Sequence, residues 1–104
     1  MSKYVLVYTG GAMAATPEEQ QKAMDAWMGW FGALGSAVVD AGNPFGPGST
    51  VASNGSVSDG GASRLTGYSI IEADSLTAAA GQAKGCPVLA SGGSIEVYEA
   101  MPIG

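Results

Sequence analysis

The chain has 104 residues, of which 46% are hydrophobic and 12% charged, and its formal net charge is −5. This length fits a single domain (1–104), and the composition supplies a core and excludes a disordered chain. The four cations are spread along the sequence without a basic cluster, so neither nucleic acid nor an anionic membrane is an expected partner.

The residue types that the chain lacks exclude several chemistries. Histidine is absent and Cys86 is the single cysteine, which excludes Ser-His-Asp and Cys-His catalysis and leaves a zinc site without ligands. No acidic cluster suggests a calcium or magnesium site, and the segment GPGST lacks the lysine of a phosphate-binding loop. We therefore expect no metal and no cofactor. One cysteine forms no intramolecular disulfide, and the N-terminal apolar run is too short for a signal peptide or a membrane helix, which predicts a cytoplasmic protein.

The first two predicted elements are a strand and a helix. Residues 3–9 (KYVLVYT) are apolar on both alternating faces, which is typical of a strand that is covered on both sides. Thr16 as N-cap, Pro17 at the first helical position and Glu19 three residues after the cap predict a capping box at the start of a helix over 16–34. Apolar residues at helical spacing predict a stripe that packs on a sheet: Ala23, Trp27, Trp30, Phe31 and Leu34.

The middle of the chain is predicted to be mostly strands. Gly35 is expected to end the helix, and a short strand is expected within 36–42. An Asn-Gly pair predicts a hairpin turn between two weak strand candidates, at 50–53 and 55–59. Residues 65–73 (LTGYSIIEA), apolar on both faces, predict a central strand.

The last elements complete a ferredoxin-like βαββαβ order. Asp74 is expected to cap a helix that begins at about residue 75 and stops at Gly85, and 93–101 form the last strand. Two helices cover only one face of a four-stranded sheet. Because the strands are apolar on both faces, we expect a second copy of the chain to cover the other face in a homodimer packed sheet to sheet.

Three tyrosines in three predicted strands are candidate ligand-binding residues: Tyr8, Tyr68 and Tyr98. Their phenols are placed in a cavity between the sheet and the partner subunit, the alternative being interface packing with satisfied hydroxyls. Alternation puts Glu96 on the face of Tyr98, opposite Ile95 and Val97. A glutamate in such a cavity is expected to pair with Arg64 or a lysine, or to have a strongly perturbed pKa.

Asp59 and Arg64 are candidates in the loop before the central strand. A partly buried Asp59 would have a raised pKa and act as an acid or base, whereas the alternative is a turn in which its side chain accepts from a nearby backbone N–H. Arg64 either anchors a ligand carboxylate or pairs with an acid. Cys86, which follows a predicted helix, is interpreted as structural.

The order of these segments resembles the YCII-related family, in its branch with an Asp-Gly-Pro-Phe motif. The resemblance covers nearly the whole chain and is most specific in GYSIIEADSLTAAAGQAKGCP and GGSIEVYE. It implies a dimeric α+β barrel. The chain matches the motif at Asp59 and Gly60 and departs from it at Gly61. The His/Asp pair of some family members cannot be carried over, because the chain has no histidine.

Three functions follow from these residues. The first is binding of a small apolar or aromatic molecule in the dimer cleft. The second is a cofactor-free lyase or isomerase, with Asp59 or Glu96 as acid or base and Arg64 or a tyrosine stabilising negative charge. The third is a structural homodimer or protein-interaction module without catalysis.

Overall fold

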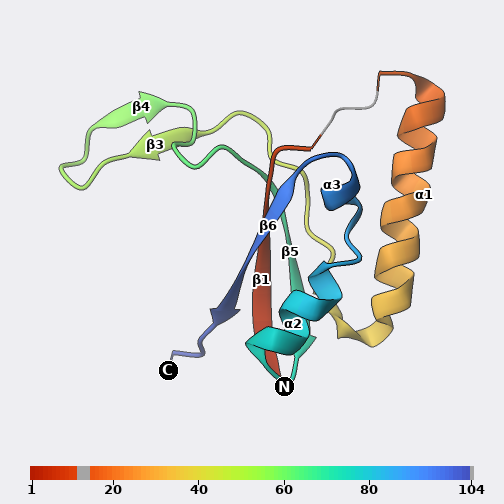
Figure 1. Cartoon of the computed structure of the whole chain (residues 1–104). Helices are drawn as coiled ribbons and strands as arrows, with labels where there is room; N and C mark the ends of the chain where they lie inside the picture. Colours follow the sequence, from red (N-terminus) through yellow and green to blue (C-terminus); the bar gives the residue numbers. More distant parts are fainter. Residues whose placement is uncertain (12–14, 104) are drawn as a thin grey trace.

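The structure, a computed structural model, describes residues 1–11 and 15–103 and has an α+β fold (Figure 1). Its main feature is a four-stranded antiparallel sheet in the order β2-β5-β1-β6, with helices on one face. The sheet strands are β1 (Ser2–Thr9), β2 (Val38–Asp40), β5 (Leu65–Ala73) and β6 (Ser94–Ala100). The helical elements are α1 (Pro17–Leu34), the 3-10 turn η1 (Gly35–Ala37), α2 (Leu76–Ala83) and the short α3 (Pro87–Ala90).

Both ends of α1 follow the sequence prediction. The hydroxyl of Thr16 accepts from the Glu19 N–H at 3.1 Å, and Pro17 occupies the first turn. The Glu19 carboxylate accepts from the N–H of Ala15 at 2.9 Å, one residue before the cap, so the capping box closes on Ala15. Gly35 ends the helix with a φ of 59°, a left-handed conformation that glycine adopts without steric cost.

The cap of α2 corrects the prediction. Ser75 caps this helix, because its backbone is extended and its hydroxyl accepts from the Ala78 N–H at 3.0 Å. Asp74, the predicted cap, lies one residue too early to reach that N–H. The short helix α3 was not predicted; Pro87 begins it, immediately after Cys86.

The core lies between the sheet and its helices. Alternate residues of β1 and β5 turn to this side and are buried: Tyr4, Leu6, Tyr8, Gly67, Ser69, Ile71 and Ala73. They pack with Trp30 of α1, Ala79 and Ala83 of α2, and Val88 of α3. In the predicted stripe of α1, Trp27, Phe31 and Leu34 are partly buried against this core, but Ala23 is exposed. The N-terminal half of α1 therefore does not pack on the sheet as predicted.

None of the helices in the described part of the chain lies over the opposite face of the sheet (Figure 1). Its central residues, Val5, Val7 and Ile70, are only half-buried. They are cross-strand neighbours, since Val5 pairs with Ile70 and Val7 with Tyr68. We call this surface the open face.

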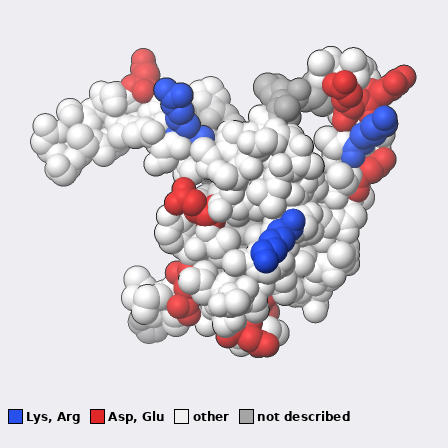
Figure 2. Space-filling view, in the orientation of Figure 1, with Lys and Arg blue, Asp and Glu red and all other residues white. Residues whose placement is uncertain are grey.

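A hairpin of β3 (Ser49–Val51) and β4 (Val57–Asp59) stands away from the body (Figures 1 and 2). The predicted Asn-Gly pair lies at its tip, and the loop closes through the Ala52 N–H, which donates to the Ser56 carbonyl at 2.8 Å. The radius of gyration is 15.1 Å, above the roughly 13 Å of a compact domain of this length. The projecting hairpin accounts for the excess. Its strands leave Val51 and Val57 exposed as a cross-strand pair.

Candidate functional site

A cavity of about 450 Å³ lies between the N-terminal half of α1 and the sheet. Its walls come from three parts of the chain: Gln20, Ala23, Met24, Trp27 and Phe31 of α1; Ala41, Gly42, Asn43 and Pro44 after β2; and Tyr8, Gly67, Tyr68 and Ser69 of the sheet. We call it the α1 cavity. It forms at the place where the exposed Ala23 shows that α1 is held off the sheet.

Aromatic rings build one wall of the α1 cavity. Trp27 contacts the ring of Tyr8 edge to face, with ring centroids 5.3 Å apart, and its centroid lies 5.8 Å from that of Phe31. Trp30, which packs on both, donates its indole N–H to the carbonyl of Gln82 at 3.1 Å. This bond ties α1 to α2, so the wall has a fixed position.

The floor of the cavity is a chain of hydroxyls. The Tyr8 hydroxyl donates to Ser69 Oγ at 2.6 Å, and Ser69 Oγ donates to the carbonyl of Ala41 at 2.7 Å. Ser69 is fully buried and Tyr8 is 4% exposed. These bonds link β1, β5 and the loop after β2, and Tyr8 and Ser69 both belong to the lining of this mainly apolar hollow.

The loop after β2 approaches β5 closely because it contains Gly42. Gly42 has a φ of 79°, and a Cβ added there would lie 1.6 Å from the carbonyl oxygen of Tyr68. Two further bonds hold the loop along the strand: Tyr68 N–H to Asn43 carbonyl at 3.3 Å, and Phe45 N–H to Thr66 carbonyl at 3.0 Å. Only glycine fits this position, so Gly42 shapes the rim of the cavity.

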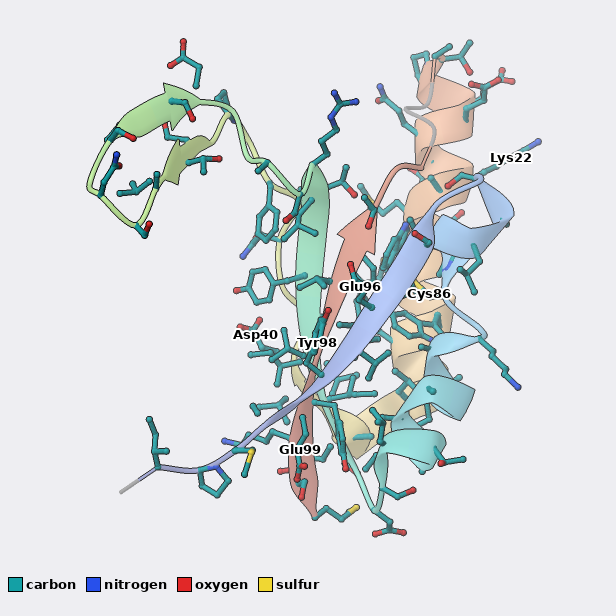
Figure 3. The ribbon with its side chains drawn as sticks, turned by 60° about the vertical axis from the view of Figure 1, so that its left-hand side comes forward. Lys22, Asp40, Cys86, Glu96, Tyr98 and Glu99 are labelled. Atoms are coloured by element: carbon teal, nitrogen blue, oxygen red, sulfur yellow. The ribbon has the colours of Figure 1, made fainter. Side chains whose placement is uncertain are left out.

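The α1 cavity carries no charge at neutral pH. None of the described residues that line it is an acid or a base. Burial raises the pKa of Tyr8 well above its usual value, and the neighbouring Cys86 raises it further. Burial likewise raises the pKa of the Cys86 thiol, which is 3% exposed and lies on the helix side of the sheet (Figure 3). Phenol and thiol both stay protonated, in keeping with a structural Cys86.

The strand register separates the three predicted tyrosines. Tyr8 turns toward the helices, whereas Tyr68 pairs with Val7 and Tyr98 with Val5, so their rings lie on the open face. The expectation of one cavity for all three phenols is therefore corrected: Tyr8 and Tyr68 both belong to the lining of the α1 cavity, but Tyr98 does not. The Tyr68 ring stacks on Phe45 at 5.8 Å, and its hydroxyl donates to Asp40 at 3.2 Å.

Glu96 and Tyr98 lie together on the open face, as alternation predicted. Ile95 and Val97 pack against the core on the other side of β6, and Figure 3 shows Glu96 and Tyr98 turned away from the helices. The Tyr98 hydroxyl donates to Glu96 Oε1, so the partner of Glu96 is this phenol rather than the predicted Arg64 or lysine. The bond to Glu96 raises the pKa of Tyr98. Both residues are exposed in the single chain.

Asp59 and Arg64 lie at the base of the hairpin. Both are exposed and line a hollow of about 580 Å³ that is separate from the α1 cavity. Asp59 is exposed in the single chain, where no partner subunit covers it. The turn is held by Thr50, whose hydroxyl donates to the Gly60 carbonyl at 2.7 Å and accepts from the Ala62 N–H at 3.0 Å. Arg64 adopts a φ of 54°, which is uncommon for a residue other than glycine.

The α1 cavity and most of its lining were not predicted from the sequence. One local signal was present: Ser69 is the polar residue among the inward positions of an otherwise apolar strand, and such a buried hydroxyl needs partners. Its hydrogen-bond partners, Tyr8 and Ala41, lie far from it in the sequence, so no local pattern could identify them.

Comparison of the chain with profiles of known protein families, with curated proteins and with solved structures finds no match. In the described part of the chain, no helix combines the length and apolar character needed to cross a membrane. Within residues 1–11 and 15–103, no three or more acidic or cysteine side chains come together as a metal site. Figure 2 shows no continuous patch of positive charge on the face in view.

Proposed function

We propose that the protein binds a small apolar or aromatic molecule in the α1 cavity of each subunit. The observation that carries this proposal is the cavity itself, because its volume falls in the range of small-molecule sites and its walls are aromatic with a few convergent polar groups. This places the ligand within one subunit, on the helix side of the sheet, rather than in the dimer cleft.

We further propose that two subunits pair through their open faces into a dimeric α+β barrel with ferredoxin-like subunits. The element order β1-α1-β2, then β5-α2-β6, supports this fold. The half-buried Val5, Val7 and Ile70, flanked by Tyr68 and Tyr98, support a covered open face, since contiguous exposed apolar side chains often mark a protein interface. The resemblance to the YCII-related family points to the same assembly.

The two other functions predict different results. A lyase or isomerase that uses Asp59 or Glu96 needs a substrate site next to one of these carboxylates, and neither lines the α1 cavity. A structural homodimer binds no small molecule at all. Binding of aromatic probes in the α1 cavity therefore separates the proposed function from both.

The test is isothermal titration calorimetry with naphthalene derivatives on two matched variants of α1. Met24 lines the cavity, whereas Met28, one turn later, does not. We expect Met24→Glu to weaken binding about tenfold or more, because it replaces an apolar lining side chain by a charge beside the ligand. Met28→Glu, which is exposed like Met24 but does not line the cavity, should bind like the parent. Equal affinities for the two variants would place the ligand elsewhere, and no binding by the parent would leave the structural homodimer.

A further inference from the structure

We propose that the α1 cavity selects a neutral, planar aromatic molecule that carries a hydroxyl or N–H donor, and that this donor bonds to the phenolic oxygen of Tyr8. The inference rests on the proposed function and adds the chemical class of the ligand. Three features of the cavity support it: the direction of the hydroxyl chain, the lack of charged residues among the described lining, and the shape of the walls.

The direction of the hydroxyl chain is fixed by its end. The carbonyl of Ala41 cannot donate, so the proton between Ser69 Oγ and that carbonyl belongs to Ser69. A serine hydroxyl has one proton, so the proton between Tyr8 and Ser69 belongs to Tyr8. The hydroxyl protons of Tyr8 and Ser69 are therefore both used in hydrogen bonds within the protein. The Tyr8 oxygen therefore offers the cavity an acceptor and no donor.

A ligand is selected by what it presents to this oxygen. A phenol, an indole or an aniline presents a hydrogen to the Tyr8 oxygen and gains a hydrogen bond. An ether or a carbonyl presents only lone pairs, which repel the lone pairs of the Tyr8 oxygen.

The absence of charge excludes anionic ligands. A carboxylate or phosphate that enters the cavity loses its hydration, and no described lining residue is a lysine or arginine that compensates this loss. Three acids stand next to lining residues in the sequence, and each already accepts a hydrogen bond: Glu19 from the Ala15 N–H, Asp25 from the Gln21 amide and Asp40 from the Gly42 N–H.

The walls favour a planar ring. Trp27 and Phe31 present aromatic surfaces on the side of α1. Met24, with its flexible thioether, lies beside them and adapts to the ring edge. A flat aromatic molecule inserted here stacks against the rings while its donor reaches the hydroxyl floor.

The test uses four probes with one ring system: naphthalene, naphthol, methoxynaphthalene and naphthoate, titrated by calorimetry into the full chain. We expect naphthol to bind about 5- to 10-fold more tightly than naphthalene, the gain of one hydrogen bond. Methoxynaphthalene should gain nothing over naphthalene, and naphthoate should bind more weakly than both. Equal binding of naphthalene, naphthol and methoxynaphthalene overturns the inference and leaves the proposed function standing. Tightest binding of naphthoate overturns it as well.

Two variants test the roles of Tyr8 and Ser69. Ser69→Ala frees the proton of Tyr8 to turn toward the ligand, so the affinity for methoxynaphthalene should rise. The ratio of the naphthol affinity to the methoxynaphthalene affinity should therefore fall toward one. Tyr8→Phe should bring naphthol to the level of naphthalene, whereas Tyr4→Phe, a buried tyrosine on the same face that does not line the cavity, should leave the preference intact. A preference for naphthol that survives Ser69→Ala unchanged overturns the inference.

Two controls identify the occupant. If none of the four probes binds, the proposed function fails and the inference fails with it. Tryptophan fluorescence is also measured on dilution of the protein without any probe. If the fluorescence changes on dilution and the probes suppress that change, a second copy of the chain occupies the face of α1. That result overturns the inference.

Discussion

Ser69 supports the fold at a point where three segments meet, and a double-mutant cycle with Tyr8 measures its contribution. Ser69→Ala removes the acceptor of the Tyr8 hydroxyl and the donor to the Ala41 carbonyl. Water replaces the second bond, because Ala41 is exposed, but the phenol is 4% exposed and loses its acceptor within the protein. An unsatisfied buried hydroxyl lowers the free energy of unfolding by about 1–3 kcal/mol.

Tyr8→Phe is expected to be milder. Ser69 keeps its bond to Ala41, and only the Tyr8–Ser69 bond is lost, about 1 kcal/mol. In the double variant the orphaned phenol is gone, so the total loss should fall short of the sum of the single losses by about 1 kcal/mol. Each kcal/mol corresponds to roughly 4–8 °C in Tm for a domain of this size.

The assay is urea unfolding at one protein concentration, followed by far-ultraviolet circular dichroism. Ser58→Ala, at an exposed position in the hairpin, serves as the control and should lie within about 0.5 kcal/mol of the parent. Additivity of the two single losses to within about 0.5 kcal/mol would refute the hydroxyl chain as described, because uncoupled sites give that result.

Three further predictions concern the rim, the open face and alkaline pH. Gly42→Ala should cost about 3 kcal/mol or more, because its Cβ meets the Tyr68 carbonyl at 1.6 Å, whereas Gly46→Ala, with open space around it, should be near neutral by the same urea assay. Val7→Lys on the open face should give a monomeric mass in light scattering while Met28→Lys stays dimeric; a dimeric Val7→Lys would contradict pairing through this face. The pKa of Tyr8 is raised in the folded state, so its contribution to stability is complete below about pH 10 and is lost as the pH rises above that. Tyr8→Phe should flatten this alkaline loss in a pH series of unfolding midpoints, and an unchanged slope would contradict the buried phenol.

Local signals predicted the regular elements well. Residues 65–73 were predicted as a central strand and form β5 with the same bounds, because period-two alternation and the flanking turn residues act over a few positions. The cap of α1 at Thr16 depends on one side-chain hydrogen bond, and its end at Gly35 depends on one backbone hydrogen bond to Phe31. Both bonds join residues that are three or four positions apart in the sequence. Where two cap-forming residues stand together, as at Asp74 and Ser75, composition does not decide between them; the backbone conformation does.

The candidate site was less predictable, because it depends on contacts between distant segments. Alternation within β1 placed Tyr8 with Tyr4 and Leu6, yet only the pairing of Val7 with Tyr68 shows that Tyr8 and Tyr68 turn to opposite faces. The α1 cavity exists because the loop at Gly42 reaches β5 while α1 stands off the sheet, and neither distance is encoded by a local pattern.

The register of β1 also governs how the chain acquires its sheet during synthesis. Ser2 pairs with Ala73 and Lys3 with Ala100, so β1 cannot pair with either neighbour until the segments around residues 65–73 and 94–100 have been synthesised. Pairing between segments so far apart in the sequence is slow, and an unpaired strand that is apolar on both sides is exposed to aggregation. The central strand β1 is therefore made before its partners, and the sheet is completed late.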